Sequence, residues 1–146
     1  MITLREMKIE DYNEIIELWE HTEGMWLSEA DSLPHIQTYL ERNPYCSFVA
    51  EEQLDTQTTV LAGTLLAGHD GRRGYMYHLA VDPAYRGQRI ATQLIEKAMK
   101  GLTDAGIDKC HIFVMATNVE GQHFWVANGW EKRDSFYVFS KDVPQH

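Results

Sequence analysis

The segment from Leu79 to Ala91 carries residue types and a spacing that suit the binding of an anion. A strand-like apolar run leads through Arg86-Gly87-Gln88-Arg89 into an apolar-striped stretch that begins at Ile90. This stripe predicts a helix over 90–102. The first N–H groups of a helix lack intrahelical partners, and the helix dipole favours negative charge there. Gly87 permits close backbone approach, and the two arginines offer donors suited to phosphate. The turn therefore predicts a phosphate site, with simple capping of the helix start as the alternative.

The elements that would position this turn are indicated by helix-like and strand-like periodicities along the chain. Hydrophobic residues make up 44% and charged residues 24% of the 146 residues, which fits one globular domain over 1–146 and not a disordered chain. Glu14, three residues after Asp11, predicts a capping box at the first helix. We expect strands at 1–7, 46–52, 58–67, 75–81, 109–115 and 135–140, and helices from Asp11, from Ser32, over 90–102 and over 118–128. The helices are too few and the strands too consecutive for a doubly wound sheet, so we expect an α/β fold of the α+β kind.

Charge is distributed unevenly along the chain. The net charge of −9 argues against a nucleic-acid partner, because phosphate backbones require a basic face. Residues 1–55 hold 13 acidic and 3 basic side chains, a charge of −10, whereas residues 56–146 sum to +1. Two interpretations stay open: the acidic excess forms solvated helix faces, or it forms a surface that attracts cationic ligands.

Several further patterns bear on the compartment. No apolar run approaches the roughly 20 residues that span a bilayer, and no basic-then-apolar leader opens the sequence. Cys46 and Cys110 lie in strand-like runs, which favours buried thiols over a disulfide framework. The histidines show no paired spacing on an expected helix or strand, so we expect no metal site. We therefore expect a cytoplasmic protein with no membrane partner.

Two segments resemble conserved motifs of the GNAT N-acetyltransferases. The first is Leu79-Ala80-Val81-Asp82-Pro83-x-Tyr85-Arg86-Gly87-Gln88-Arg89-Ile90-Ala91, which is similar to motif A with its signature Gln/Arg-x-x-Gly-x-Gly/Ala. The second is Asn118-x-x-Gly121-x-x-Phe124-Trp125-x-x-x-Gly129-Trp130, which is similar to the family's Asn-x-x-Ala-x-x-Phe-Tyr-x-x-x-Gly-Phe segment. The separation of the two motifs and the expected order of elements also resemble that family, and the likeness is greatest to small stand-alone bacterial members.

The resemblance implies a fold and a cosubstrate. The fold would be a mixed, mostly antiparallel sheet of about six or seven strands with about four helices, splayed at an acetyl-CoA cleft. The strand carrying Leu79 and Val81 would hold the pantetheine arm through its backbone, and the N–H groups of 87–91 would hold the pyrophosphate. The expected acetyl-CoA-binding residues are Leu79, Ala80, Val81, Arg86, Gly87, Gln88, Arg89, Ile90, Ala91 and Asn118.

The sequence departs from the family pattern at three positions. Arg89 stands at the second glycine of motif A, and we expect ordinary helical dihedral angles there. Trp125 stands where many relatives have a general-acid tyrosine, and indole cannot usefully protonate a thiolate. Phe113 stands where some relatives place a glutamate base. The family's usual acid and base are therefore both absent.

The strand before motif A supplies substitute candidates for the base. Strand alternation predicts that Tyr75 and Tyr77 point the same way as Leu79, with His78 opposite. Tyr77, through an ordered water, is one candidate for removing the proton of the amine, and His78 is the other if the strand distorts at the splay. The alternatives are that both tyrosines form core or cleft wall and that His78 is a hydrogen-bonded, non-catalytic histidine.

The acceptor side is expected in the N-terminal third. Trp26 could provide an apolar wall or a cation–π face, together with Met25, and Glu23 and Glu29 could provide opposing charge. Tyr75 is a further substrate-binding candidate. The resemblance implies an N-acetyltransferase acting on a primary amine of a cationic small molecule or peptide, with a non-catalytic acyl-CoA-binding sensor as the alternative. A homodimer is left open.

Overall fold

A computed structural model describes residues 1–145 as two compact units, the first spanning Met1–Phe113 and the second beginning at Val114. The first unit contains β1 (Ile2–Glu6), α1 (Tyr12–Glu20), α2 (Leu33–Arg42), β2 (Phe48–Gln53), β3 (Thr59–His69), β4 (Gly74–Val81), α3 (Ile90–Asp104) and β5 (Cys110–Ile112). Three short 3-10 helices, η1 (Ile9–Asp11), η2 (Glu29–Asp31) and η3 (Pro83–Tyr85), precede α1, α2 and α3. The second unit contains α4 (Val119–Ala127). The prediction of one domain over the whole chain stays a prediction.

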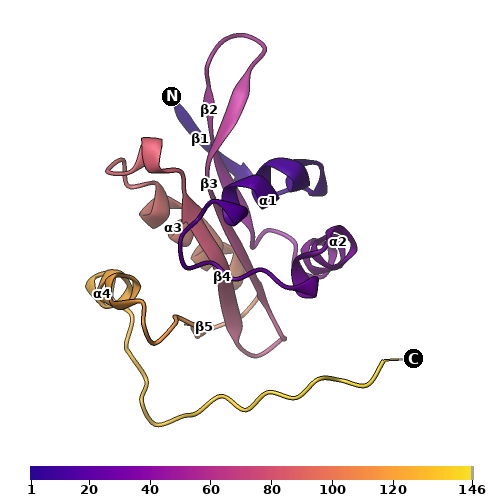
Figure 1. The fold of residues 1–146 in the computed structure, drawn as a ribbon, viewed down its shortest axis with the longest axis vertical. Coiled ribbons are helices and arrows are strands. Elements are labelled where there is room, and N and C mark those ends of the chain that lie inside the picture. Colours follow the sequence, from indigo (N-terminus) through magenta and orange to yellow (C-terminus); the bar gives the residue numbers. More distant parts are fainter. Residues whose placement is uncertain (146) are drawn as a thin grey trace. The chain divides into compact units, whose positions relative to one another are not determined.

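The five strands form one sheet in the order β1-β2-β3-β4-β5 (Figure 1). All neighbours are antiparallel except β4 and β5, which are parallel. β5 pairs with Gly74–Met76 of β4 only, whereas β4 continues to Val81. The two strands therefore separate after Met76, as expected for a splayed sheet. The predicted fold class, a mixed and mostly antiparallel sheet with four helices, is confirmed.

The strand count is five within residues 1–145, fewer than the six or seven expected. The strand expected at 135–140 does not form in the described chain. Its apolar side chains are exposed, with Tyr137 87% and Phe139 94% accessible. Alternating apolar residues indicate a capacity for strand formation, but a strand needs a partner for its backbone hydrogen bonds.

The helices cover opposite faces of the sheet. α1 and α2 pack on one face around a core that includes Trp19, Ile36 and Leu66, and Figure 1 shows the two helices on the same side. α3 packs on the other face, where the backbone of Gly63 lies next to the side chains of Ile90 and Leu94. Nearly all the candidate catalytic and acceptor residues lie on the α1–α2 side, and the motif A turn introduces α3.

Asp11 does not cap α1 as the sequence suggested. Its carboxylate instead takes both guanidinium nitrogens of Arg5, at 2.8 and 2.9 Å, and the backbone N–H of Lys8 at 2.9 Å. Burial opposes ionisation, but these hydrogen bonds lower the pKa of Asp11 below its usual value. The capping box was predicted wrongly because Arg5, on the adjacent strand, competes for the same carboxylate. Asp11 thus fixes η1 and the start of α1 against β1.

The second unit is built around an aromatic cluster. Trp125 is buried and meets Phe124 and Trp130 edge-on, with ring centroids 5.2 and 4.8 Å apart. Trp125 therefore has a packing role within this unit. Across residues 1–145, no helix has the length and apolar character needed to cross a membrane.

Candidate functional site

The turn between β4 and α3 has the backbone of an anion cradle. Asp82 accepts the N–H of Ala84 at 2.9 Å and starts η3, which leads into the exposed segment Arg86–Arg89. Gly87 has φ +82° and Arg89 has φ +62°, both left-handed. The expectation of ordinary helical angles at Arg89 is therefore wrong. The chain must reverse direction before α3 starts, and an exposed arginine without a β-branch can take this conformation at about 1–2 kcal/mol.

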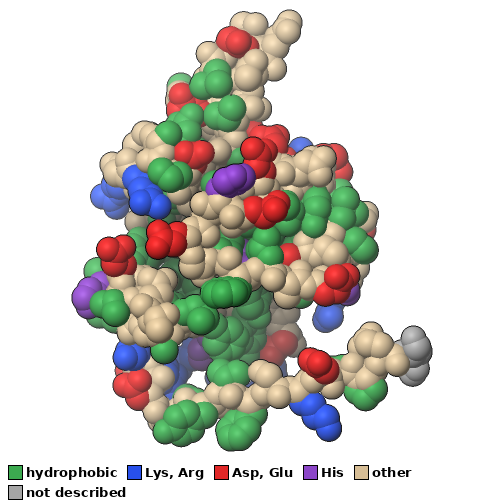
Figure 2. Space-filling model, in the orientation of Figure 1, with side chains coloured by type: hydrophobic (Ala, Val, Ile, Leu, Met, Phe, Trp, Pro, Cys, Tyr) green, Lys and Arg blue, Asp and Glu red, His purple; other side chains and the backbone are tan. Residues whose placement is uncertain are grey.

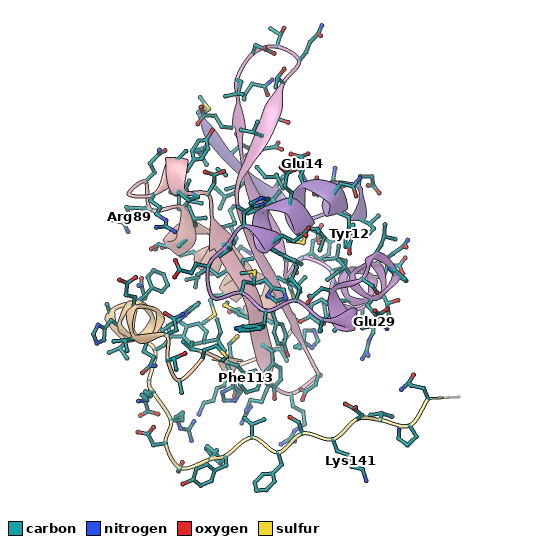
Figure 3. All side chains as sticks on the ribbon, viewed as in Figure 1. Tyr12, Glu14, Glu29, Arg89, Phe113 and Lys141 are labelled. Atoms are coloured by element: carbon teal, nitrogen blue, oxygen red, sulfur yellow. The ribbon has the colours of Figure 1, made fainter. Side chains whose placement is uncertain are left out.

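The start of α3 is open to a ligand. Within the described chain, no side chain caps the helix at Arg89, and its first turn holds no acidic residue. A Cβ added at Gly87 would meet no described atom within 4 Å, so the space beside this backbone is free. Figure 3 shows Arg89 on the turn itself, at the edge of the molecule, and Figure 2 shows basic side chains gathered there. Unpaired N–H groups, a helix dipole and two arginines suit a polyanion such as a pyrophosphate.

The strand that leads to this turn is distorted at His78. Leu66 pairs with Tyr77 and Thr64 pairs with Ala80, so one residue of β3 opposes two of β4. His78 has φ +49°, which is left-handed. Such a bulge resets the alternation of side chains. The prediction that His78 points away from Tyr77 is therefore wrong: both meet the layer formed by α1 and α2.

His78 makes specific contacts on that face. Its Nε2 lies 2.8 Å from Oδ1 of Asp31, and its ring packs on Trp19 with the centroids 4.5 Å apart. The indole N–H of Trp19 donates to Oγ1 of Thr64 at 2.8 Å, and that hydroxyl reaches the carbonyl of His78 at 3.3 Å. The His78 and Asp31 side chains are only 15% and 9% accessible. The distortion that would allow His78 to act is therefore present.

Asp31 is the residue that the sequence analysis missed. It lies 47 positions from His78, and no local pattern links the two. The only sequence signal is the spacing of Ser28 and Asp31, which is that of a short helix start. Asp31 indeed closes a capping interaction at η2, where its Oδ2 accepts the N–H of Ser28 at 3.0 Å.

The two tyrosines of β4 lie in different surroundings. Tyr77 packs edge-on against Tyr39 at 6.3 Å beside the core, and burial raises the pKa of Tyr77. Tyr75 lies where β4 and β5 are paired, 5.7 Å from the ring of His111 and stacked 6.3 Å from Phe113. Tyr77 thus lies next to His78 in the sequence and packs beside the core. Tyr75 instead contacts the partly exposed rings of His111 and Phe113.

Leu79, Ala80 and Val81 form the end of β4, beyond the last residue paired with β5. Ala80 is buried among the core residues of the α1–α2 face, and Leu79 and Val81 are half-buried. Ile90 is buried at the start of α3, and Ala91 is half-buried. Ala80 and Val81 pair with β3, and residues 79–81, none of which pairs with β5, lead through the turn to the start of α3.

The acceptor candidates lie in the segment between α1 and η2. Trp26 is 77% exposed, and Glu23 and Glu29 are exposed as well. Met25 packs against the core, so it is not the free apolar wall that was expected. Trp26 remains available to a ligand.

Asn118 lies in the second unit. Its Oδ1 accepts the N–H of Gly121 at 2.9 Å and so caps α4. The expected contact of Asn118 with the cosubstrate stays a prediction. A surface depression of about 540 Å³ between β1 and α3 contains none of the candidate residues; it is lined by Ile2, Thr3, Leu4, Gln93, Glu96, Lys97 and Lys100.

A strand that leaves its parallel neighbour, followed by a glycine-containing turn and an uncapped helix, is the arrangement that the resemblance to the GNAT N-acetyltransferases implied. The family model described as the acetyltransferase (GNAT) family matches residues 11–130. An acetyltransferase of Sodalis glossinidius is 30% identical over 140 residues, which is 94% of this chain and 93% of the relative. The chain belongs to the GNAT family of acetyltransferases.

Solved structures agree on the fold. An acetyltransferase of Clostridium acetobutylicum with acetyl-CoA aligns with a TM-score of 0.76 at 17% identity, covering 96% of both chains. The aminoglycoside acetyltransferase AAC(6')-Iy, with a bisubstrate analogue that joins CoA to acetylneamine, aligns with a TM-score of 0.75 at 18% identity, covering 98% of this chain and 99% of that one. The family model and the curated relatives thus identify the protein as an N-acetyltransferase.

Proposed function

We propose that this enzyme acetylates a primary amine of a cationic small molecule or basic peptide. The observation that carries the proposal is the polarity of charge. Residues 1–55, which include β1, α1, α2 and β2, hold a charge of −10, and the rest of the chain sums to +1. Figure 2 shows acidic side chains over the side that carries α1 and α2. Such a field attracts cations to that side while the arginines attract the anionic donor to the turn before α3.

The chain's own residues supply a place for the donor. Acetyl-CoA brings the acetyl group as a thioester, so the carbonyl carbon is already activated toward an amine. The N–H groups of 87–91 and the guanidinium groups of Arg86 and Arg89 would hold the pyrophosphate, with Gln88 beside them. The edge of β4 at Leu79–Val81, which β5 does not pair, would hold the pantetheine arm through backbone hydrogen bonds. These interactions fix the thioester near His78.

Proton transfer is assigned to His78. An ammonium group must lose a proton before its nitrogen can attack, and a lysine-like amine has a pKa of about 10.4. Nδ1 of His78 would accept that proton, because Nε2 already faces Asp31. The nitrogen–carbon bond then forms, the carbon–sulfur bond breaks, and its electron pair leaves with the sulfur. The nitrogen of the new amide loses its second proton to the thiolate through solvent, and the first proton leaves the imidazole for bulk solvent, which regenerates the base. Tyr77 could assist by orienting a water.

Acceptor recognition would rest on Trp26, Glu23 and Glu29, with Tyr75 as a second aromatic contact. An exposed indole can bind an ammonium group by a cation–π interaction worth about 0.5–1 kcal/mol at an exposed site. The CoA–acetylneamine complex of the structural neighbour supports the class of acceptor, because neamine carries several amines.

The test is an acceptor screen that follows thiol release at two ionic strengths. At 0.1 M salt, thiol release should be faster with polyamines, basic peptides and lysine-like amines than with neutral aryl-amines. The preference should weaken at 1 M, because the Debye length falls from about 10 Å to about 3 Å. A neutral or acidic amine preferred tenfold, without salt dependence, would refute the cationic acceptor. Trp26→Ala and Glu23→Gln should each reduce the preference, with Glu131→Gln in the second unit as the charge-matched control.

Trp125 stands where many relatives of the family have the acid, and Phe113 stands where some have the base. These two residues favour one alternative function, a sensor that binds acyl-CoA without turnover. Such a protein would gain thermal stability with acetyl-CoA but release no thiol with any amine of the panel. The same screen separates the two functions, because binding and turnover are measured on one preparation.

A further inference from the structure

We propose that Asp31 is the positioning residue of a His78–Asp31 pair in which Asp31 selects the tautomer and orientation of the base. The proposal rests on the proposed amine acetylation and deepens it. It concerns a residue that lies on a different element from His78 and contributes no contact expected from the motif A resemblance. Its basis is a chain of contacts that fixes both partners.

Asp31 is held from three directions. Its Oδ2 accepts the N–H of Ser28 at 3.0 Å, and its own N–H donates to the carbonyl of Ser28 at 2.9 Å. The hydroxyl of Tyr12, on α1, donates to the backbone carbonyl of Asp31 at 2.6 Å. With its backbone and one carboxylate oxygen fixed, the carboxylate has one oxygen left, Oδ1, and this atom faces Nε2 of His78 at 2.8 Å.

His78 is held just as firmly. Its ring lies against the fully buried indole of Trp19, and the Trp19–Thr64 hydrogen bond continues to the carbonyl of His78. Its backbone is left-handed in the middle of a bulge, a conformation that persists only where the surroundings over-determine it. Non-glycine residues in such conformations gather at functional sites, and here the bulge turns the imidazole toward Asp31.

The contact defines which nitrogen can act. A carboxylate only accepts hydrogen bonds, so Nε2 must carry the proton that it donates to Asp31. In the neutral ring, Nδ1 then holds the lone pair and is the atom that can take a proton from the amine. When it does so, the adjacent carboxylate stabilises the imidazolium, which is the orienting role that an aspartate plays beside a catalytic histidine.

Other charged and titratable groups lie around this pair. Tyr12 packs between α1 and η2, and burial together with Asp31, Glu20 and Glu29 raises the pKa of Tyr12. Figure 3 shows Tyr12 and Glu29 on the side of the sheet that carries α1 and α2. These acids act on Tyr12, whose hydroxyl contacts Asp31, so a pH profile must be compared with one from Glu29→Gln before a change is ascribed to Asp31.

Asp11 offers a matched control for Asp31. Both are buried aspartates that end a 3-10 helix, and both accept the backbone N–H of the residue three positions earlier. They differ in the second partner, which is Arg5 for Asp11 and His78 for Asp31. A loss that arises from the helix cap alone should therefore appear in both variants.

The experiment compares Asp31→Asn with Asp11→Asn in steady-state kinetics against pH, with CoA affinity measured by calorimetry. In Asp31→Asn the new carbonyl takes the N–H of Ser28, so the amide NH2 faces Nε2 and drives the imidazole proton to Nδ1. We expect kcat to fall roughly 100-fold or more, the range typical of general-base loss. The KM for acetyl-CoA and the CoA affinity should stay within twofold, and the pH limb that reports the base should be lost. Asp11→Asn should lower thermal stability while it keeps kcat and the pH profile.

A second measurement does not depend on a folded variant. Nitrogen-15 shifts of the neutral His78 ring in the wild-type enzyme, recorded at alkaline pH, should show the proton on Nε2. A proton on Nδ1 would overturn the proposal. So would an Asp31→Asn enzyme with kcat within threefold of wild type, or equal kinetic losses in the two aspartate variants. A wild-type enzyme that binds CoA but turns over no amine refutes the proposed function instead, and the ring tautomer would still report on the pair.

Discussion

Gly87→Glu should abolish most of the affinity for CoA, because it places a carboxylate in the cradle that the turn before α3 provides. Gly87 has φ +82° and no described atom lies within 4 Å of an added Cβ. The first atom of the new side chain therefore has open space around it, and we expect the carboxylate to extend into the space assigned to the pyrophosphate. The loss of affinity should come from the ligand and not from a displaced neighbour.

The expected magnitude follows from Coulomb's law. A carboxylate about 6 Å from one phosphate charge is repelled by about 0.7 kcal/mol in bulk water and by about 2.8 kcal/mol at an effective dielectric of 20. At about 1.4 kcal/mol per decade, these energies correspond to about 3-fold and 100-fold in Kd for each phosphate charge. Because a pyrophosphate carries more than one charge, we expect a loss of at least about tenfold at 0.1 M salt, and less at 1 M.

Two control variants separate this effect from backbone strain. Gly87→Ala places a Cβ at the same left-handed angle without the charge, at about 1–2 kcal/mol of stability. Gly71→Glu puts the same charge in the β3–β4 hairpin, at φ +91° and also in open space. Calorimetric titration of all three should show a large loss for Gly87→Glu alone. Binding by Gly87→Glu within twofold of Gly87→Ala would refute the placement of the pyrophosphate.

Four further predictions concern single residues. Burial raises the pKa of the Cys110 thiol to about 11 from the ordinary 9.0. A thiol reagent at pH 8 should therefore label Cys110 about 100-fold more slowly in the native protein than in urea, because less thiolate is present. Equal labelling rates would contradict the burial of this thiol. Burial opposes the ionisation of Asp11, but the hydrogen bond from Arg5 lowers its pKa below the unfolded value. The Arg5–Asp11 pair therefore stabilises the fold above about pH 4, and this contribution is lost as the pH falls through the lower folded pKa. Asp11→Asn should flatten the dependence of the urea-unfolding free energy on pH over about pH 2–5, and curves parallel to those of the wild type would argue against the pair. Arg89→Gly should raise the free energy of unfolding by up to about 1 kcal/mol by relieving the left-handed angle, and should weaken CoA binding with a shallower salt dependence; a less stable variant would be the contrary result. Tyr77→Phe should lower kcat/KM by about tenfold at most, the value of one hydrogen bond, and a loss as large as that of His78→Gln would make Tyr77 the base.

Local patterns were sufficient for the four helices and for the first four strands of the sheet, but not for the strand expected at 135–140, which does not form in the described chain. The apolar stripe of α3 marks a 15-residue helix, and the strands at β2, β3 and β4 lie within two or three residues of their expected bounds. These features depend on periodicity and on glycine, both of which act within a few residues. The start of α3, with Gly87 before it, was therefore visible in the sequence.

The pairing of His78 with Asp31 could not be predicted because it depends on long-range register. Simple alternation along β4 placed His78 on the wrong face, and only the pairing of Thr64 with Ala80 and Leu66 with Tyr77 reveals the extra residue. A bulge is set by how two strands meet and not by the residues of one strand. The identity of Asp31 as the partner then follows from where α1 and η2 pack, 47 positions away in the chain.

The left-handed residues of the described chain show how the site is built. Three are not glycine, and two of these, His78 and Arg89, border the segment Leu79–Gln88. Each carries about 1–2 kcal/mol of backbone strain, which the fold must offset elsewhere. At His78 the left-handed angle belongs to a bulge that turns the imidazole toward a buried carboxylate. At Arg89 it belongs to a chain reversal that exposes the first N–H groups of α3. Extended or helical angles would not readily form either feature. Strained backbone thus lies at both ends of the segment that joins the proposed base, His78, to the proposed anion site before α3, and a transfer from an anionic donor to an amine would use both sites.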